Sequence, residues 1–246
     1  MAPPSREFVM QATVPAEIRV FDDAQALARG AAEWLCALAG AGRGDFAVCL
    51  AGGSTPRRLY QLLAQAPIAP RFPWDRVHWF WGDERFVPHD HPDSNYRMAY
   101  EALLSRVPVP GANVHAIPTE GLSPGQAADE YEATLRRFHR AGRPLFDVTL
   151  LGIGEDGHTA SLFPGAPALE EERRWVVAVN GARPQPRITL TYPALNSSRD
   201  LAFLASGAAK SAIVRRARAA DRALPAARVL PAGRLHWFTD RAASPS

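Results

Sequence analysis

Short apolar runs alternate with amphipathic stretches along most of the chain. The apolar runs are rich in β-branched and aromatic residues, which is typical of buried strands. Between the early runs, apolar residues recur three and four positions apart, which predicts helices. Because strand and helix patterns alternate, we expect an α/β fold with a doubly wound, mainly parallel sheet and helices on both faces. The predicted strands cover residues 17–21, 46–52, 76–84, 113–117, 147–154, 174–180, 187–192, 201–207 and 235–240, and the predicted helices cover 22–39, a segment starting near Pro56, 94–104 and 124–140.

No long Gly/Ser linker, low-complexity tract or fixed-period repeat interrupts this pattern. The chain has 246 residues, 47% of them apolar, which is enough for one large core. We therefore expect a single α/β domain over residues 17–246, preceded by a loose lead-in at residues 1–16. In a sheet of this kind ligands bind outside the carboxyl ends of the strands, so the residues that follow each strand are the candidates for a site.

The expected location is the cytoplasm. No apolar run reaches the roughly 20 residues that a membrane helix needs, so we expect no membrane partner. Residues 1–16 lack a basic segment followed by an apolar one, so no secretory signal is visible. Cys36 and Cys49 both lie in apolar patterns, which favours two buried thiols in a reducing compartment over a disulfide or a metal pair.

The net charge of +3 suits an anionic substrate. The densest basic run, residues 215–222, has no interleaved aromatic residues, so it indicates a solvated helix face and not a nucleic-acid partner. Lys210 is the single lysine among 28 basic residues, which singles it out as a candidate for a specific role.

The stretch AGGSTP at residues 51–56 predicts an anion site after the second strand. Gly52 and Gly53 allow a tight turn and a close approach of the backbone to a ligand. Thr55 is a suitable N-cap and Pro56 a suitable first helical residue, so free N–H groups and the helix dipole would converge there with the hydroxyls of Ser54 and Thr55. An ordinary capped turn is the alternative, but the paired hydroxyls favour phosphate. A nucleoside triphosphate is not expected, because no Gly-Lys-Ser/Thr follows.

Two acids and an arginine, Asp83, Glu84 and Arg85, follow the third strand, where it opens into the expected cleft. One of the acids is expected in a strand-end salt bridge, and the other residues are expected to serve the site. Downstream, Ser94 is the predicted N-cap of a helix, and Asn95 either lines the cleft or helps with capping.

The fifth strand is followed by LGIGEDGH at residues 151–158, where three glycines fit G-x-G-x-x-G. We do not expect dinucleotide binding, because Glu155 and Asp156 would place negative charge beside a pyrophosphate and a better anion loop lies at 52–56. The glycines instead allow the backbone to bend so that Asp156 and His158 face the cleft. Histidine titrates near neutral pH and suits a general base, and a neighbouring carboxylate can fix its tautomer. A hydrogen-bonded loop histidine is the alternative.

Arg187 begins one of the later predicted strands, and Lys210 follows another, near a predicted helix start. Either is compatible with an ordinary surface charge. Together with the 52–56 loop they would clamp a phosphate, the arginine as a planar fork and the lysine as a point charge. His89 and His91 are spaced for a metal, but no third ligand accompanies them, so we expect loop histidines and no metal site.

Five motifs in this order resemble the 6-phosphogluconolactonase family, the sugar-lactone hydrolases of the oxidative pentose phosphate pathway. The motifs are LAGGSTP, WGDERFVP, LLGIGEDGHTASLFP, PRITLT and GAAK. The resemblance implies a Rossmann-like fold, no required metal, no organic cofactor, His158 as the catalytic base, and Arg187 and Lys210 as ligands of the substrate phosphate. Related glucosamine-6-phosphate deaminases carry an acid shortly after the histidine, and the segment ASLFPG has none, which favours the lactonase.

The expected reaction is hydrolysis of 6-phospho-D-glucono-1,5-lactone by water that His158 activates, without a covalent intermediate, since no G-x-S-x-G is present. Backbone N–H groups or Arg85 would stabilise the oxyanion. Either Asp156 or Asp83 would orient the histidine or the sugar. The alternatives are a sugar-phosphate deaminase or isomerase on the same fold, and a phosphosugar-binding protein without catalysis. The expected partner is this small molecule alone, bound by a monomer or a weak homo-oligomer.

Overall fold

The computed structural model describes residues 16–244. Its main sheet has six strands in the order β1-β9-β8-β5-β2-β3, and every neighbouring pair is parallel. This arrangement confirms the mainly parallel sheet that the sequence predicts. The strands are β1 (Ala16–Phe21), β2 (Phe46–Leu50), β3 (Val77–Trp81), β5 (Phe146–Leu151), β8 (Ser198–Ala205) and β9 (Arg234–Asp240).

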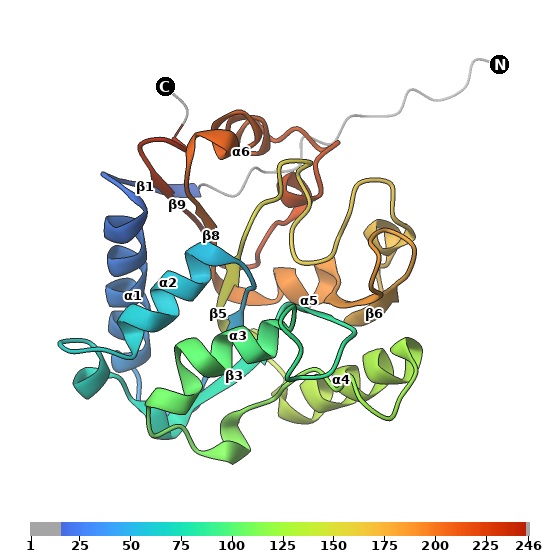
Figure 1. Ribbon diagram of the computed structural model, residues 1–246, viewed down its shortest axis with the longest axis horizontal. Helices are drawn as coiled ribbons and strands as arrows, with labels where there is room; N and C mark the ends of the chain where they lie inside the picture. Colours follow the sequence, from blue (N-terminus) through green and yellow to red (C-terminus); the bar gives the residue numbers. More distant parts are fainter. Residues whose placement is uncertain (1–15, 245–246) are drawn as a thin grey trace.

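Helices cover both faces of this sheet. Helices α1 and α2 pack against each other on one side, and α4 and α5 lie on the other (Figure 1). Local signals fix where they begin: the Asp23 side chain accepts hydrogen bonds from two N–H groups of α1, and Ser123 with Gln126 forms a capping box on α4. The helices are α1 (Ala24–Gly40), α2 (Ser54–Leu63), α3 (Asn95–Ala102), α4 (Pro124–Phe138), α5 (Tyr192–Asn196) and α6 (Ser211–Arg218).

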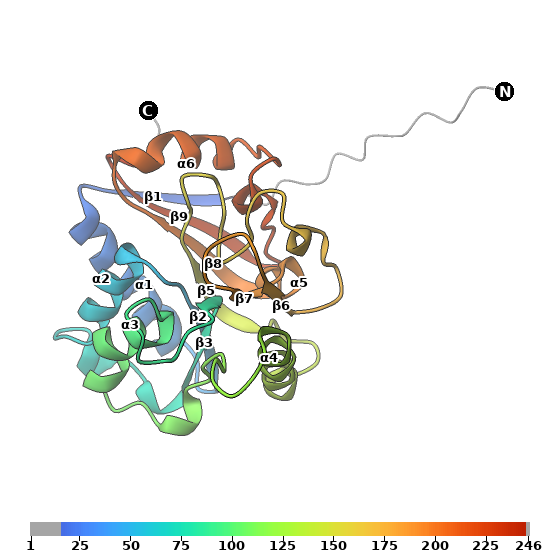
Figure 2. The ribbon, with the colours of Figure 1, turned by 45° about the vertical axis from the view of Figure 1, so that its right-hand side comes forward.

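A second, antiparallel sheet was not predicted. It contains β4 (Asp83–Arg85), β7 (Arg187–Leu190) and β6 (Val176–Val179), and α4 packs on it (Figure 2). The run 76–84, expected as one strand, is divided at Gly82, which donates to Leu50 O of the main sheet and accepts from Leu190 N of the second. Gly82 therefore joins the two sheets just where the carboxyl end of β3 is reached.

Two further expectations about local structure were wrong. Residues 113–117 do not form a strand, because a 3-10 turn occupies Gly111–Asn113 and only Val114 bridges to Trp79. Helix α2 begins at Ser54 with Gly53 as the N-cap, so Thr55 lies inside the first turn and does not cap it. Strand β1 begins at Ala16, one residue before the predicted domain boundary. The rest of the predicted lead-in lies outside the described residues.

The core fills the space between sheet and helices with large side chains, among them Trp79, Phe80 and Phe203. Cys36 and Cys49 are buried and unpaired, as expected. Burial raises the pKa of both thiols, which keeps them in the unreactive protonated form. Within residues 16–244, no helix combines the length and the apolar character needed to cross a membrane.

An ion cluster around the buried carboxylate of Asp200 makes stability depend on pH. The carboxylate of Asp200 on β8 accepts hydrogen bonds from Arg234 Nε at 2.7 Å, Arg234 Nη2 at 2.8 Å and His236 Nε2 at 2.8 Å. Burial raises the pKa of Asp200, but the hydrogen bonds from His236 and Arg234 outweigh it and lower the pKa from 3.8 to about 2. The charged form is therefore favoured by folding.

We expect Asp200→Asn to lower the free energy of unfolding at pH 7 by about 2 kcal/mol, since one pKa unit corresponds to about 1.4 kcal/mol. A lowered carboxyl pKa stabilises the fold above the unfolded value of 3.8 and stops doing so as pH falls toward about 2. The difference between the wild type and the variant should therefore shrink over that window in urea titrations. Asp221→Asn, which removes a surface partner of Arg216, is the control. A difference that is constant from pH 7 to pH 2 would contradict the linkage.

Candidate active site

The carboxyl ends of β2, β3, β5 and β8 open into one cleft of about 410 Å³. This volume falls in the usual range of small-molecule sites, about 300–1,000 Å³. The walls come from the loop before α2, from β4 and β7 of the second sheet, and from the loops that follow β5 and β8. The cleft therefore lies where a sheet of this topology is expected to bind its ligand.

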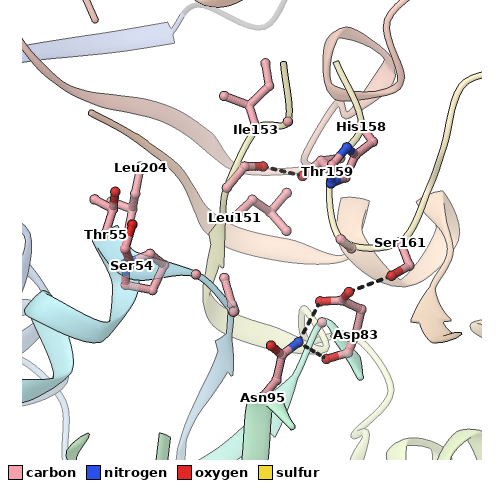
Figure 3. A pocket seen from close by; sticks show the side chains of 18 of the residues that line it. Ser54, Thr55, Asp83, Asn95, Leu151, Ile153, His158, Thr159, Ser161 and Leu204 are labelled. Carbon is pink, nitrogen blue, oxygen red and sulfur yellow. Dashed lines mark hydrogen bonds between the residues drawn. The ribbon is translucent and has the colours of Figure 1, made fainter. Parts of the chain in front are cut away.

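The glycine loop between β2 and α2 forms one wall. A Cβ on Gly52 would lie 2.1 Å from Asn95 Oδ1, so only glycine allows this close approach. Gly53 has φ of 103°, which favours glycine, and no side chain caps the helix that it precedes. The first N–H groups of α2 are thus without a side-chain cap among the described residues, and Ser54 and Thr55 lie on the same wall (Figure 3).

Asp83 is the centre of a hydrogen-bond network on the wall that faces Ser54 and Thr55 (Figure 3). Its Oδ2 accepts from Ser161 Oγ at 2.6 Å, and its Oδ1 lies 3.3 Å from Asn95 Nδ2, which also donates to Asp83 O at 2.9 Å. Asn95 therefore lines the cleft and connects the start of α3 to β4. Both oxygens of Asp83 are occupied by neutral donors.

Glu84 has a structural role, whereas Asp83, the other acid of this strand, belongs to the cleft wall. It is buried and accepts hydrogen bonds from the N–H groups of Arg85, Asn95 and Tyr96 at 2.7 Å each and from Ser94 Oγ at 3.0 Å. Burial raises the pKa of Glu84, and these backbone hydrogen bonds offset part of the rise. Glu84 thus fixes the start of α3 by accepting its free N–H groups, where a salt bridge was expected.

His158 and Asp156 are in contact after the glycine-rich turn that follows β5. His158 Nδ1 lies 2.5 Å from Asp156 Oδ1, and His158 N donates to the same oxygen at 3.1 Å. The turn depends on glycine, because a Cβ on Gly154 would lie 2.1 Å from His158 Nδ1, and Gly157 has φ of 83°. His158 lines the cleft (Figure 3), and the contact of its Nδ1 with Asp156 fixes the imidazole and leaves Nε2 for a ligand.

The cleft also gathers positive charge. Arg85 and Arg187 are opposite each other in the β4–β7 pairing, and both line the cleft. Burial and then the neighbouring Arg85 charge lower the pKa of Arg187, and its buried Nη1 has no hydrogen-bond partner among residues 16–244. Arg85 Nη1 donates to Asp93 O at 2.5 Å. Lys210 completes the group at the start of α6. A guanidinium N–H that is buried without a partner is a position for a ligand anion.

The structure brings ten of the eleven predicted site residues to this one cleft, and the eleventh, Asp156, contacts His158. His89 and His91 are elsewhere: His89 Nε2 lies 2.8 Å from Ile117 O, and His91 Nδ1 accepts from Asp93 N at 3.1 Å. Across the described part of the chain no group of three metal-ligating side chains occurs. The ten lining residues are Gly52, Gly53, Ser54, Thr55, Asp83, Arg85, Asn95, His158, Arg187 and Lys210.

Among the cleft residues that the sequence analysis missed, three contact the predicted residues Asp83, His158 or Asp156. Ser161 and Phe163 lie in the same stretch as His158, and their short spacing from it was an available signal. Arg183 lies on the loop before β7 and donates from Nη2 to Asp156 Oδ2 at 2.9 Å. Nothing in the sequence distinguishes this arginine from the many others in the chain.

An α/β sheet with an uncapped helix start, four cations and a carboxylate–histidine pair at the carboxyl ends of its strands has the features of an enzyme for an anionic substrate. The family model described as glucosamine-6-phosphate isomerases/6-phosphogluconolactonase matches residues 22–237. The chain belongs to this family.

Named relatives agree with this assignment. The chain is 44% identical over 207 residues to a 6-phosphogluconolactonase from Nostoc sp., covering 82% of this chain and 84% of the relative. It is 41% identical over 248 residues to a 6-phosphogluconolactonase from Homo sapiens, covering 96% and 95%. A crystal structure of 6-phosphogluconolactonase from Thermotoga maritima superposes with a TM-score of 0.80 at 32% identity, covering 92% of this chain and all of that one.

Proposed function

We propose that this protein hydrolyses 6-phospho-D-glucono-1,5-lactone to 6-phospho-D-gluconate in the oxidative pentose phosphate pathway. The observation that carries the proposal is the contact between His158 Nδ1 and Asp156 at the edge of a cleft that four cationic side chains line. The names of the relatives at 41–44% identity support the same reaction.

The substrate phosphate is assigned to the wall formed by the glycine loop and the later cations. The first N–H groups of α2 carry partial positive charge and have no side-chain cap among the described residues. Arg187 supplies a fork with a buried, unpartnered Nη1, and Lys210 supplies a point charge. The residues proposed to contact phosphate are Gly52, Gly53, Ser54, Thr55, Arg187 and Lys210.

His158 is assigned the role of general base. Its Nε2 takes a proton from water, and the water oxygen attacks C1 of the lactone to form a tetrahedral oxyanion. The oxyanion then collapses, the bond between C1 and the ring oxygen breaks, and the imidazolium returns its proton to that oxygen. Because no protein atom bonds to the substrate, no covalent intermediate forms.

Of the two acids that were candidates for orienting His158, the contacts favour Asp156. Asp156 touches Nδ1 of the histidine, whereas both oxygens of Asp83 accept from Ser161 and Asn95. Asp83 is therefore assigned to the sugar hydroxyls, with Asn95 beside it. Arg85 and backbone N–H groups remain the two candidates for stabilising the oxyanion.

We infer that the reaction needs neither a metal nor an organic cofactor, because proton transfer, an oxyanion donor and a phosphate clamp meet its chemical needs. The proposed partner is the phosphosugar lactone alone, and the proposed location is the cytoplasm.

The direct test supplies freshly made 6-phosphogluconolactone and follows acid release above the spontaneous rate. We expect acceleration by the protein, and no ammonia from glucosamine 6-phosphate, because the segment after His158 offers Ser161 and Phe163 and no further acid–base group. Glucosamine 6-phosphate is expected to compete weakly, since its phosphate meets the same residues. Ammonia release at a rate comparable to lactone hydrolysis would favour the deaminase. Binding of 6-phosphogluconate without any turnover would favour a binding protein.

A further inference from the structure

Arg183 connects the second sheet to the two groups that surround His158. It lies on the loop between β6 and β7, and its Nη2 donates to Asp156 Oδ2 at 2.9 Å. Its guanidinium carbon lies 4.6 Å from the centroid of the Phe163 ring, and that ring lies 4.9 Å from the His158 ring, centroid to centroid. Arg183 thus contacts both the carboxylate behind the imidazole and the aromatic ring beside it.

The two oxygens of Asp156 are divided between two partners. Oδ1 accepts from the backbone N–H and the ring of His158, and Oδ2 accepts from Arg183. Burial raises the pKa of Asp156, but the hydrogen bonds from His158 and then Arg183 outweigh it, so the pKa lies below its ordinary value. A carboxylate held at both oxygens has little freedom to rotate, and it stays ionised.

We propose that Arg183 is a positioning residue that holds Asp156 and Phe163 so that His158 Nε2 faces the cleft. The inference rests on the proposed function, in which His158 takes a proton from water. Without Arg183, Oδ2 would be open to water and the Asp156 side chain would gain alternative rotamers. The imidazole would then spend part of its time turned away from the water that it must deprotonate, which lowers kcat.

The expected size of the effect is modest. Arg183 and Asp156 are 42% and 40% exposed, and half-exposed ion pairs contribute at most about 1 kcal/mol. One kcal/mol corresponds to about fivefold in rate. We therefore expect Arg183→Ala to lower kcat about fivefold, with KM unchanged within about twofold because Arg183 is not assigned to the phosphate.

The chain offers a closely matched control in Arg136. Like Arg183, it pairs with a carboxylate, Glu132 at 2.6 Å, and its guanidinium carbon lies over an aromatic ring, Trp175 at 4.4 Å. It belongs to α4 and does not line the cleft. Arg136→Ala should leave kcat, KM and the pH profile unchanged, while removing the same kinds of contact.

The pH profile gives a readout that a merely structural role would not move. Removing a positive charge next to the Asp156–His158 pair makes protonation of the pair easier, so the acid limb of kcat/KM should move to higher pH by about half a unit. Arg183→Lys keeps the positive charge but loses the planar guanidinium. Its acid limb should therefore match that of the wild type, and its kcat should lie between those of the wild type and Arg183→Ala. The other charged groups that line or flank the cleft are the same in every variant: Asp83, Arg85, Glu155, Arg187 and Lys210.

A second measurement does not depend on turnover. In proton NMR spectra, the Nδ1–H of His158, assigned by its absence in His158→Ala, should be a downfield resonance protected by its bond to Asp156. Arg183→Ala should broaden this resonance by exchange with water, and Arg136→Ala should leave it sharp.

Failure of the wild type to hydrolyse the lactone would overturn the proposed function and leave this NMR test valid. Arg183→Ala matching Arg136→Ala in kcat, acid limb and NMR resonance would overturn the role of Arg183.

Discussion

Replacing His158 with alanine is expected to lower kcat for lactone hydrolysis by about 10²–10⁴-fold, the contribution that general acid–base groups usually make. The imidazole is held at Nδ1 by Asp156, 2.5 Å away, and lines the cleft beside the proposed position of the lactone carbonyl. Alanine removes the group that takes the proton from water and returns it to the ring oxygen. Stopped-flow measurement of acid release, corrected for spontaneous hydrolysis, gives kcat directly.

Substrate binding should change little in this variant, because the phosphate is assigned to the other side of the cleft. The dissociation constant of 6-phosphogluconate, measured by calorimetry, should stay within about threefold, which is under about 1 kcal/mol. His91→Ala is the matched control, since this histidine contacts Asp93 in a loop and does not line the cleft. Wild-type turnover in His158→Ala would remove this residue from the mechanism.

Replacing Lys210 with alanine is expected to raise KM for the phosphorylated lactone by about 10- to 100-fold. A hydrogen bond to a charged group contributes about 1.5–3 kcal/mol, which corresponds to this range. Lys210 lines the cleft at the start of α6, where Asp240 holds the preceding loop by accepting from Ser206 Oγ at 2.5 Å and Gly207 N at 3.1 Å. The ammonium group is therefore presented by a fixed segment.

The test of a phosphate contact is whether Lys210→Ala impairs only the phosphorylated substrate. On glucono-1,5-lactone, which has no phosphate, Lys210→Ala should have little effect on kcat/KM. Arg215→Ala removes one charge from an exposed position of the same helix and should affect neither substrate, which controls for net charge. Equal losses on the phosphorylated and the unphosphorylated lactone would point to a structural role for Lys210.

Local hydrophobic patterns were sufficient to predict most strands of the main sheet. Strands β2, β3, β5 and β8 are buried on both faces along most of their length, so each appears in the sequence as a nearly continuous apolar run. Residues 113–117 were the exception, because an apolar run next to a 3-10 turn at Gly111–Asn113 makes a single bridge to β3 and no ladder. The second sheet could not be predicted as a unit: β4 has three residues, too few to show a period.

The sequence by itself determined the parts of the site whose residues are neighbours along the chain. The glycine loop at 52–55 and the pair of Asp156 and His158 depend on backbone conformations that glycine provides, and glycine is visible in the sequence. The order of strands and helices placed both at the carboxyl edge of one sheet, because parallel strands share that edge.

Only the tertiary structure decided which charges meet. Arg85 and Arg187 are opposite each other through the pairing of β4 with β7, and Arg183 reaches Asp156 across 27 positions of sequence. It also separated two adjacent acids, burying Glu84 under the start of α3 and leaving Asp83 at the cleft. The physical reason is that hydrogen bonds and charge contacts act over a few ångströms. Their partners are therefore chosen by how strands and loops pack, and no spacing along a single chain records that choice.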